Sequence, residues 1–180
     1  KKKKIKKPEN YRLKKYHEQT RDTSTLTEKQ RKKLHQIVTN YGVHPFDLKK
    51  DVDWKRLLAR VDVVPPSMVL AQAANESAWG QSRFAVLGNN FFGQWCYSPG
   101  CGLVPLKRAP GAHHEVKRFK NIEESIASYL HNLNTNRGYQ VFRQLREQLR
   151  GQHQALAGNT LAQGLINYSE RKQLYVKSIR

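Results

Sequence analysis

The chain has 180 residues, which is enough for one domain with a sizeable hydrophobic core. Its 33 Lys and Arg against 14 Asp and Glu give a formal net charge of +19, and it contains no run of 18 apolar residues that would mark a transmembrane helix. The charge favours a polyanionic partner, but charge alone does not choose among nucleic acid, anionic lipid and bacterial cell wall. No glycine-rich phosphate loop follows a predicted strand, so nucleotide binding is not indicated.

Residues 1–25 are rich in charge, Thr and Ser and show little apolar periodicity, so they predict a basic, flexible N-terminal arm. Residues 1–34 hold 14 basic and 4 acidic side chains. Aromatic side chains of the kind that stack on bases are limited here to Tyr11 and Tyr16, so a nucleic-acid partner is not favoured. The first residue is Lys rather than Met, and we expect a signal or anchor segment to have been removed.

Residues 26–180 are expected to form a single domain that begins with two amphipathic helices. Thr27 and Gln30 form a capping box before an apolar helical face. Asp51 or Asp53 is expected to cap the second, shorter helix, which buries Trp54.

A third helix carries a single carboxylic acid, Glu76, at its end. Pro65 and Pro66 can open this helix and Gly80 suits its stop. A carboxylate near a helix C-terminus lies at the negative end of the helix dipole, which disfavours ionisation. Trp79 is expected to exclude water from the carboxylate, which also raises its pKa. Glu76 therefore has the predicted surroundings of a general acid that donates a proton near neutral pH.

The sequence changes character over residues 88–119, where glycines and prolines separate short extended pieces and residues 114–119 alternate as in a strand. Side-chain amides in the first part of this segment can bind sugar hydroxyl or acetamido groups, and its aromatic rings can stack on a sugar ring. The residues predicted to bind substrate here are Asn89, Asn90, Phe92, Gln94 and Trp95.

Two cysteines stand on either side of a Tyr-Ser-Pro-Gly turn. This turn chemistry directs Cys96 and Cys101 toward each other and predicts a disulfide, which favours an oxidising compartment such as the bacterial periplasm. A zinc site that adds His113 and His114 is the alternative. Adjacent histidines on a strand point to opposite faces, which disfavours that site.

Helical periodicity returns after residue 120. Asn121 is expected to cap a helix with Glu124 three residues on, and further amphipathic segments follow at residues 142–151 and from residue 161. The order of helices, a small β-rich insertion and further helices predicts a mostly helical α+β fold.

Two segments carry a resemblance to a known family. A-Q-A-A-N-E-S-A-W-G-Q-S at residues 71–82 and G-N-N-F-F-G at residues 88–93 resemble the two signatures of the bacterial glucosaminidase family. The resemblance covers roughly residues 64–179 and implies a lysozyme-like fold with a small β-hairpin lobe and a catalytic glutamate, Glu76. Further segments indicate one subgroup of the family, namely residues 94–96, 101–105, 129, 132–134 and 168–170.

The resemblance also implies a second catalytic carboxylate in the β lobe. Glu115 is the one acidic residue between Glu76 and Glu123, which makes it the candidate for activating water or acting as nucleophile. Its alternative role is a surface ion pair with Lys117 or Arg118. If Glu115 is not catalytic, the 2-acetamido group of the substrate can supply the nucleophile instead.

Tyrosines near the C-terminus resemble a further motif of the family. The resemblance makes Tyr168 a catalytic candidate that orients water or the N-acetyl group, against the alternative of a core tyrosine. It also places Gln72 and Tyr175 among the substrate-binding residues. Glu170 and Arg171 stand where the family usually has Thr and Asp.

The predicted function is that of a peptidoglycan hydrolase, an endo-β-N-acetylglucosaminidase that cleaves the β-1,4 bond after N-acetylglucosamine. It needs no cofactor or metal, binds peptidoglycan glycan strands, acts as a monomer and lies in the periplasm or cell envelope of a bacterium. The alternatives are a lytic transglycosylase, which also works with one helix-borne Glu, and a non-catalytic module that binds cell wall or another polyanion.

Overall fold

A computed structural model describes residues 9–23 and 25–180 as a mostly helical α+β fold. The helices are α1 (Glu9–Thr23), α2 (Glu28–Asn40), α3 (Asp51–Arg60), α4 (Pro66–Ser77), α5 (Arg83–Gly88), α6 (Ile122–Thr135), α7 (Gln140–Gly151), α8 (Gly158–Leu161) and α9 (Gln173–Ile179), with the 3-10 turns η1 (Arg137–Tyr139) and η2 (Ala162–Leu165). The strands are β1 (Trp95–Cys96), β2 (Gly102–Leu103) and β3 (Glu115–Lys117). Within the described residues, no helix combines the length and the apolar character needed to cross a bilayer.

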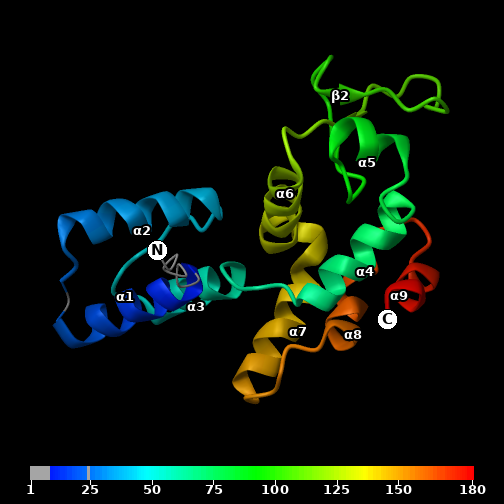
Figure 1. The fold of residues 1–180 in the computed structure, drawn as a ribbon. Coiled ribbons are helices and arrows are strands. Elements are labelled where there is room, and N and C mark those ends of the chain that lie inside the picture. The colour runs from blue at the N-terminus through cyan, green and yellow to red at the C-terminus, as the bar shows by residue number, and fades with distance from the viewer. Residues whose placement is uncertain (1–8, 24) are drawn as a thin grey trace, which may run out of the picture.

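The helices fall into two groups, each with its own hydrophobic core. In Figure 1, α1, α2 and α3 lie together on one side, and an extended segment leads from α3 to α4 and the remaining helices. We call residues 9–61 the N-terminal unit and residues 66–180 the C-terminal unit. The fold confirms the mostly helical α+β architecture with a small β lobe, as expected for a lysozyme-like protein.

The N-terminal unit includes α1, so the prediction of a flexible arm is wrong for residues 9–23. Leu13 of α1 is fully buried in the same core as Trp54 and Leu57 of α3. The ring of His17 also stacks on Trp54, with ring centroids 5.0 Å apart. Tyr16 also packs against this core, but Leu13 is the one fully apolar side chain that the helix buries in it, so the apolar periodicity was too weak to be recognised. Residues 1–8 and 24 of the predicted arm lie outside the described residues.

The C-terminal unit has the larger core, which is unusually rich in tyrosine. Aliphatic residues of α4, α6, α7, η2 and α9 surround it, and Tyr129, Tyr139 and Tyr175 are buried within it. Burying tyrosine requires a partner for each hydroxyl, because an unpaired polar group in a core is destabilising. These hydroxyl partners organise the candidate site described below.

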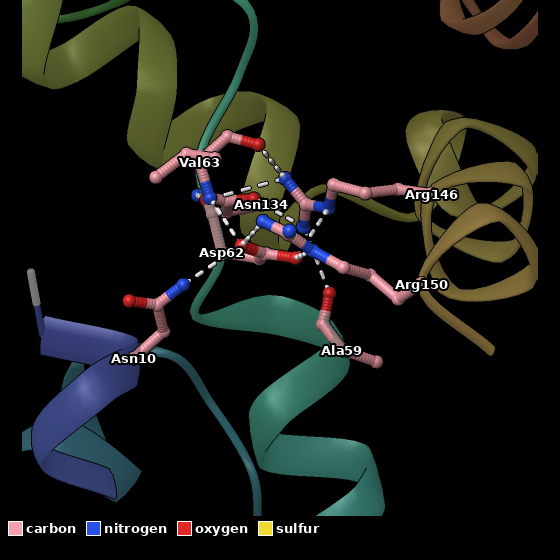
Figure 2. A network of polar contacts seen from close by, with 7 residues as sticks. All are labelled: Asn10, Ala59, Asp62, Val63, Asn134, Arg146 and Arg150. Atoms are coloured by element: carbon pink, nitrogen blue, oxygen red, sulfur yellow. Dashed lines mark hydrogen bonds and ion pairs between the residues drawn. The ribbon is translucent and has the colours of Figure 1, made fainter. Parts of the chain in front are cut away.

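A polar junction connects the two units (Figure 2). The carboxylate of Asp62 accepts hydrogen bonds from Asn10 of α1 at 2.9 Å and from two nitrogens of Arg150 of α7 at 2.9 and 3.0 Å. Arg146 of α7 is 1% exposed and donates to the carbonyl oxygens of Ala59, Asp62 and Val63 and to the side chain of Asn134. Burial opposes ionisation of Asp62, but the Arg150 hydrogen bonds and the charge of Arg146 hold its pKa below the ordinary value.

The β lobe is a three-stranded antiparallel sheet in the order β1-β3-β2. Central β3 pairs Glu115 with Cys96 of β1 and Lys117 with Gly102 of β2. The predicted disulfide between Cys96 and Cys101 is present, with Cα atoms 6.2 Å apart. A Cβ on Gly102 would lie 2.0 Å from the carbonyl oxygen of Val116, so glycine is required where β2 approaches β3.

Most predicted helix ends are confirmed. Thr27 with Gln30 forms the capping box of α2, and the Asn121 side chain accepts from the Glu124 backbone N–H at the start of α6. The predicted cap of α3 is wrong, because Lys50 occupies the cap position without a side-chain bond. Asp53 lies inside the first turn of α3, where its carboxylate accepts the backbone N–H of Asp47.

Candidate active site

Glu76 lies in the last turn of α4, at a sharp change of chain direction. Ala78, Trp79 and Gly80 follow with φ values of 50°, 57° and 81°, so three successive residues adopt the left-handed region. The carbonyl oxygen of Ala74 accepts the N–H of both Ala78 and Trp79. A left-handed conformation costs a residue other than glycine about 1–2 kcal/mol. Such strain persists at functional sites when the surroundings enforce it. The helix thus stops at Ser77 rather than near Gly80, directly after the acid.

The loop that follows α5 brings the second sequence signature to the carboxylate. Gly93 has a φ of +63°, and a Cβ added to it would lie 3.3 Å from Oε2 of Glu76. Since ordinary residues avoid this φ and a side chain would press on the carboxylate, glycine fits both requirements. The two signatures, separated in sequence, therefore meet at Glu76.

A chain of hydrogen bonds leads from the core toward Glu76. The Tyr129 hydroxyl donates to Oε1 of Gln72, whose Nε2 donates to the Tyr175 hydroxyl at 2.8 Å. The Tyr175 hydroxyl also acts on Glu76, since its hydrogen-bonding effect lowers the pKa of the carboxyl group. Gln72 and Tyr129 are fully buried and Tyr175 is 1% exposed, so the core holds these three side chains in place.

Burial raises the pKa of the half-buried Glu76, as predicted. Hydrogen bonds from Tyr175 and Asn75 and the charge of Arg171 oppose this effect without cancelling it. The predicted cause was wrong in one respect. Trp79 is 84% exposed, so it does not exclude water from the carboxylate in this structure. The neighbours of the Glu76 carboxyl group are instead Tyr175, Asn75 and Gly93.

Tyr168 lies in the aromatic cluster behind the site. Its hydroxyl donates to the carbonyl oxygen of Phe92 at 2.8 Å, and its ring stacks on Tyr175 at 5.4 Å between centroids. Phe92 itself is 3% exposed and stacks on Tyr129 at 4.1 Å. Since a hydroxyl has one proton, Tyr168 in this conformation holds the loop at residue 92, and Tyr175 is the tyrosine that contacts the acid.

The amides predicted to bind sugar are used within the protein. Asn90 is 2% exposed, donates to the carbonyl oxygens of Gln94 and Lys117, and accepts the N–H of Phe92 and Gln94. Asn89 donates to the carbonyl oxygen of Phe119. The Gln94 amide is held against α6 by the Ser125 carbonyl and the Ser128 hydroxyl. These three side chains shape the loop that carries Gly93 to Glu76.

Two tryptophans remain open to a ligand. Trp95 is 54% exposed and stacks with one face on His114 at 4.0 Å between ring centroids. Trp79, directly after the acid-bearing helix, is 84% exposed. Among the residues predicted to bind sugar, Trp95 is the one whose exposed ring suits stacking.

Glu115 contacts the loop closed by the disulfide. Its two carboxylate oxygens accept the backbone N–H of Gly100 at 2.9 Å and of Gly102 at 2.7 Å. These hydrogen bonds lower its pKa, so the side chain is held ionised. The Glu115 carboxylate also lies within 4.8 Å of both cysteine sulfurs. The two sulfurs are joined to each other, and both oxygens of Glu115 accept backbone amides, so Glu115 and the disulfide together stabilise the loop. His114, named in the alternative zinc site, stacks on Trp95.

The sequence did not single out Gly93 or Tyr129 as parts of the site. Tyr129 lies on the buried face of an amphipathic helix, where periodicity predicts only a core residue. Its polar role follows from the facing Gln72, 57 positions earlier, which no local pattern reports. For Gly93 the available signal was the signature itself, since a glycine that closes a polar loop suggests close backbone approach.

Comparison with known proteins agrees with this geometry. The family model Glucosaminidase, described as mannosyl-glycoprotein endo-beta-N-acetylglucosaminidase, matches residues 52–179. A bacterial protein named Protein bax, from Escherichia coli (strain K12), is 36% identical over 146 residues, which is 81% of this chain and 52% of that protein. The chain therefore spans about half the length of this curated relative. The match confirms the subgroup indicated by the additional sequence segments. No solved structure matches the chain.

Proposed function

This chain belongs to the glucosaminidase family, and from that premise we propose that it hydrolyses the β-1,4 bond after N-acetylglucosamine in peptidoglycan, with Glu76 as the general acid. The observation that carries the proposal is one half-buried carboxyl group, Glu76, at which the two sequence signatures meet through Gly93 and whose pKa is raised by burial. The buried hydrogen bonds from Tyr129 to Gln72 and from Gln72 to Tyr175 support the helix face behind it. A raised pKa keeps the proton on Glu76 until the leaving glycosidic oxygen takes it.

The proposed reaction begins with proton transfer from Glu76 to the glycosidic oxygen as the bond to the anomeric carbon breaks. The carbonyl oxygen of the substrate's 2-acetamido group attacks that carbon, and water then opens the resulting ring. We favour this substrate-assisted route because both oxygens of Glu115 are engaged by Gly100 and Gly102. Glu115 as the base for water is the second version, and its ionised state suits that role. Tyr168 as a residue that orients water or the N-acetyl group would require its bond to Phe92 to break.

Substrate contacts follow from exposure. Trp95, with one open face, is proposed to stack on a sugar ring. Tyr175 is buried, so it is proposed to affect the substrate indirectly, by lowering the pKa of Glu76. Five further side chains are proposed to support binding by holding the loop in place, namely Gln72, Asn89, Asn90, Phe92 and Gln94.

Family membership and the disulfide support action on cell-wall glycan outside the cytoplasm, in the periplasm or cell envelope. We propose a monomer that acts without a metal or cofactor.

Product analysis on purified peptidoglycan tests the proposal. Borohydride reduction of the digest followed by acid hydrolysis is expected to yield glucosaminitol, because cleavage after N-acetylglucosamine leaves that sugar as the reducing end. Glu76→Gln keeps the shape of the side chain and removes its proton, so the rate should fall by about 10²–10⁴-fold with the fold unchanged. Glu123→Gln, an exposed change at the start of α6, is the matched control and should leave the rate unaltered.

Each alternative gives a different product. Muramitol would mean cleavage after the other sugar and contradict the proposed bond. Anhydro-muramyl ends would identify a lytic transglycosylase, in which an internal hydroxyl rather than water attacks the anomeric carbon. Wall binding without products by the unaltered chain would identify a non-catalytic module. Activity of Glu76→Gln within about tenfold of the parent would remove Glu76 from the role of general acid.

A further inference from the structure

A positively charged groove lies between α3 of the N-terminal unit and α7 of the C-terminal unit, remote in sequence from the motifs around Glu76. Five cationic side chains line it together with one acidic residue, Glu147. The cationic residues are Lys55, Arg56, Arg60, Arg137 and Arg143. On α3, Arg56 and Arg60 are four residues apart and so lie on one helical face, next to Lys55. Arg137 comes from η1 and Arg143 from α7.

Two of these arginines are held in place by carbonyl groups instead of carboxylates. Arg60 donates from Nη1 to the carbonyl oxygens of Tyr41 and Gly42 at the end of α2, at 2.6 and 3.1 Å. Arg143 donates from Nη1 to the carbonyl oxygens of Leu133 and Asn136 at the end of α6, at 2.9 and 2.8 Å. Carbonyl partners orient a guanidinium group but leave its full charge uncompensated. Burial, followed by the nearby charge of Arg60, lowers the pKa of Arg143.

The other arginines of α7 show the contrast. Arg146 and Arg150 lie at the junction, where both face the carboxylate of Asp62. In the groove, Arg56 pairs with Asp53 at 2.9 Å. Across residues 9–23 and 25–180, no carboxylate lies within ion-pair distance of Lys55, Arg60, Arg137 or Arg143. Arg143 is 8% exposed, and its Nη1 makes both carbonyl bonds. No buried side-chain nitrogen in the described residues lacks a hydrogen-bond partner. The other nitrogens of Arg143 are therefore accessible from the groove that this residue lines.

We propose that this groove is a second binding site for the cell-wall polymer, and that it takes the carboxylate groups of the peptides attached to the glycan. Guanidinium groups bind carboxylates through paired, charge-assisted hydrogen bonds, and orienting them in advance reduces the entropy lost on binding. The concave shape between two helices suits a chain better than a flat membrane surface. The proposal rests on the proposed function, because it names part of the same substrate.

The groove and Glu76 lie on different elements of the fold. The groove is lined from α3 and α7, whereas Glu76 lies in the last turn of α4, which begins at Pro66. A peptide-free glycan lacks the carboxylates that the groove is proposed to bind, whereas a wall fragment with attached peptides offers them.

Binding and turnover of a charge-reversed variant test this site. Lys55→Glu with Arg137→Glu changes two exposed side chains that form no side-chain hydrogen bond or ion pair within the described part of the chain. Lys29→Glu with Arg180→Glu makes the same change of charge at exposed positions outside the groove. In co-sedimentation with insoluble peptidoglycan at low salt, both pairs are made in the Glu76→Gln background so that the wall stays intact. The groove pair should weaken binding about tenfold or more, and the control pair less than about twofold.

Two further arms identify the ligand group and separate this site from the catalytic proposal. After carbodiimide amidation of the wall carboxylates, the parent and the groove variant should bind equally. With Glu76 intact, the groove pair should raise KM on the wall and leave turnover of a short N-acetylglucosamine oligomer unchanged. Equal wall binding by the groove pair and the parent would overturn the groove site, as would a difference that persists on amidated wall. Failure of the intact chain to cut the wall would overturn the proposed function, while the binding arms would still decide on the groove. If the groove pair unfolds, Lys55→Gln with Arg137→Gln replaces it.

Discussion

The N-terminal and C-terminal units bury different kinds of side chain. The N-terminal core consists of aliphatic residues around Trp54, and Asp53 is its one buried polar or charged side chain among the described residues. The C-terminal unit buries Gln72, Ser125 and several tyrosines as well as Glu115, Asn90 and Arg143. Buried polar groups are favourable only when every hydrogen bond is made. The core of the C-terminal unit therefore depends on specific hydrogen bonds, whereas that of the N-terminal unit depends mainly on apolar packing.

The two units also differ in how they contact each other. Each has a separate apolar core. The contacts between them include the polar junction at Asp62 and Arg146 (Figure 2) and a ring contact of Tyr41 with His131 of α6. When a buried arginine loses its one carboxylate partner, its charge is left uncompensated and the folded state is strongly destabilised. The junction is therefore the place where a single substitution should separate the behaviour of the two units.

Asp62→Ala is expected to have the largest effect on stability. It leaves Arg146, which is 1% exposed, without its carboxylate, and breaking a buried ion pair costs about 3–5 kcal/mol. Denaturant unfolding can follow the units separately, since Trp54 is fully buried while Trp79 and Trp95 are exposed. In the variant, the blue-shifted Trp54 emission should be lost at lower denaturant than the far-UV circular dichroism of the whole chain.

Asp51→Ala is the control for this comparison, because Asp51 pairs with His17 at the surface and exposed pairs contribute about 0–1 kcal/mol. Coincident transitions at an unchanged midpoint in Asp62→Ala would show that Asp62 does not hold the units together.

The stabilisation by Asp62 should also depend on pH. The pKa of Asp62 is lowered on folding, so its contribution to the free energy of unfolding is present above the ordinary pKa of 3.8. It should be lost as the pH falls through the lower, folded-state value.

Tyr175→Phe tests the polar contacts behind Glu76, with a smaller expected cost of about 1–3 kcal/mol, because it leaves the buried Nε2 of Gln72 without its acceptor. The Tyr175 hydroxyl lowers the pKa of Glu76, so its removal should raise that pKa further. A general acid must be protonated to act, and the basic limb of the pH–rate profile should therefore move to higher pH. Tyr168→Phe removes the bond to Phe92 and should leave this limb in place. An unmoved limb in Tyr175→Phe would show that the hydrogen-bond chain does not control Glu76.

Glu115→Gln is expected to have the smallest effect, confined to the β lobe. The substitution weakens the acceptance of the Gly100 and Gly102 amides, whose hydrogen exchange should become faster while the Trp54 transition stays unchanged. We expect kcat to stay within about tenfold of the parent, since a lost general base usually costs 10²–10⁴-fold. A larger fall together with loss of the acidic limb of the pH–rate profile would instead establish Glu115 as the base for water.

Local sequence chemistry predicted much of this protein. The capping box at Thr27, the cap at Asn121, the opening of α4 at Pro66 and the Cys96–Cys101 disulfide are all set by residues within a few positions of one another. The raised pKa of Glu76 was also predicted, from the helix end and from loss of water, and burial is its cause in the structure. The signature around residues 71–93 was enough to identify the family.

Tertiary structure alone decided which side chains serve the candidate site. Asn90 and Gln94 were predicted to bind sugar from their residue type, but their hydrogen bonds to Lys117 and Ser128 could not be foreseen locally. Gln72 meets Tyr175 across 103 positions, and Arg146 meets Asp62 across more than 80. A sequence pattern reports which groups need partners, whereas the partner is chosen by which helix faces pack together. For this reason the acid could be named from the sequence, and its supporting tyrosines, the polar junction and the cationic groove only from the fold.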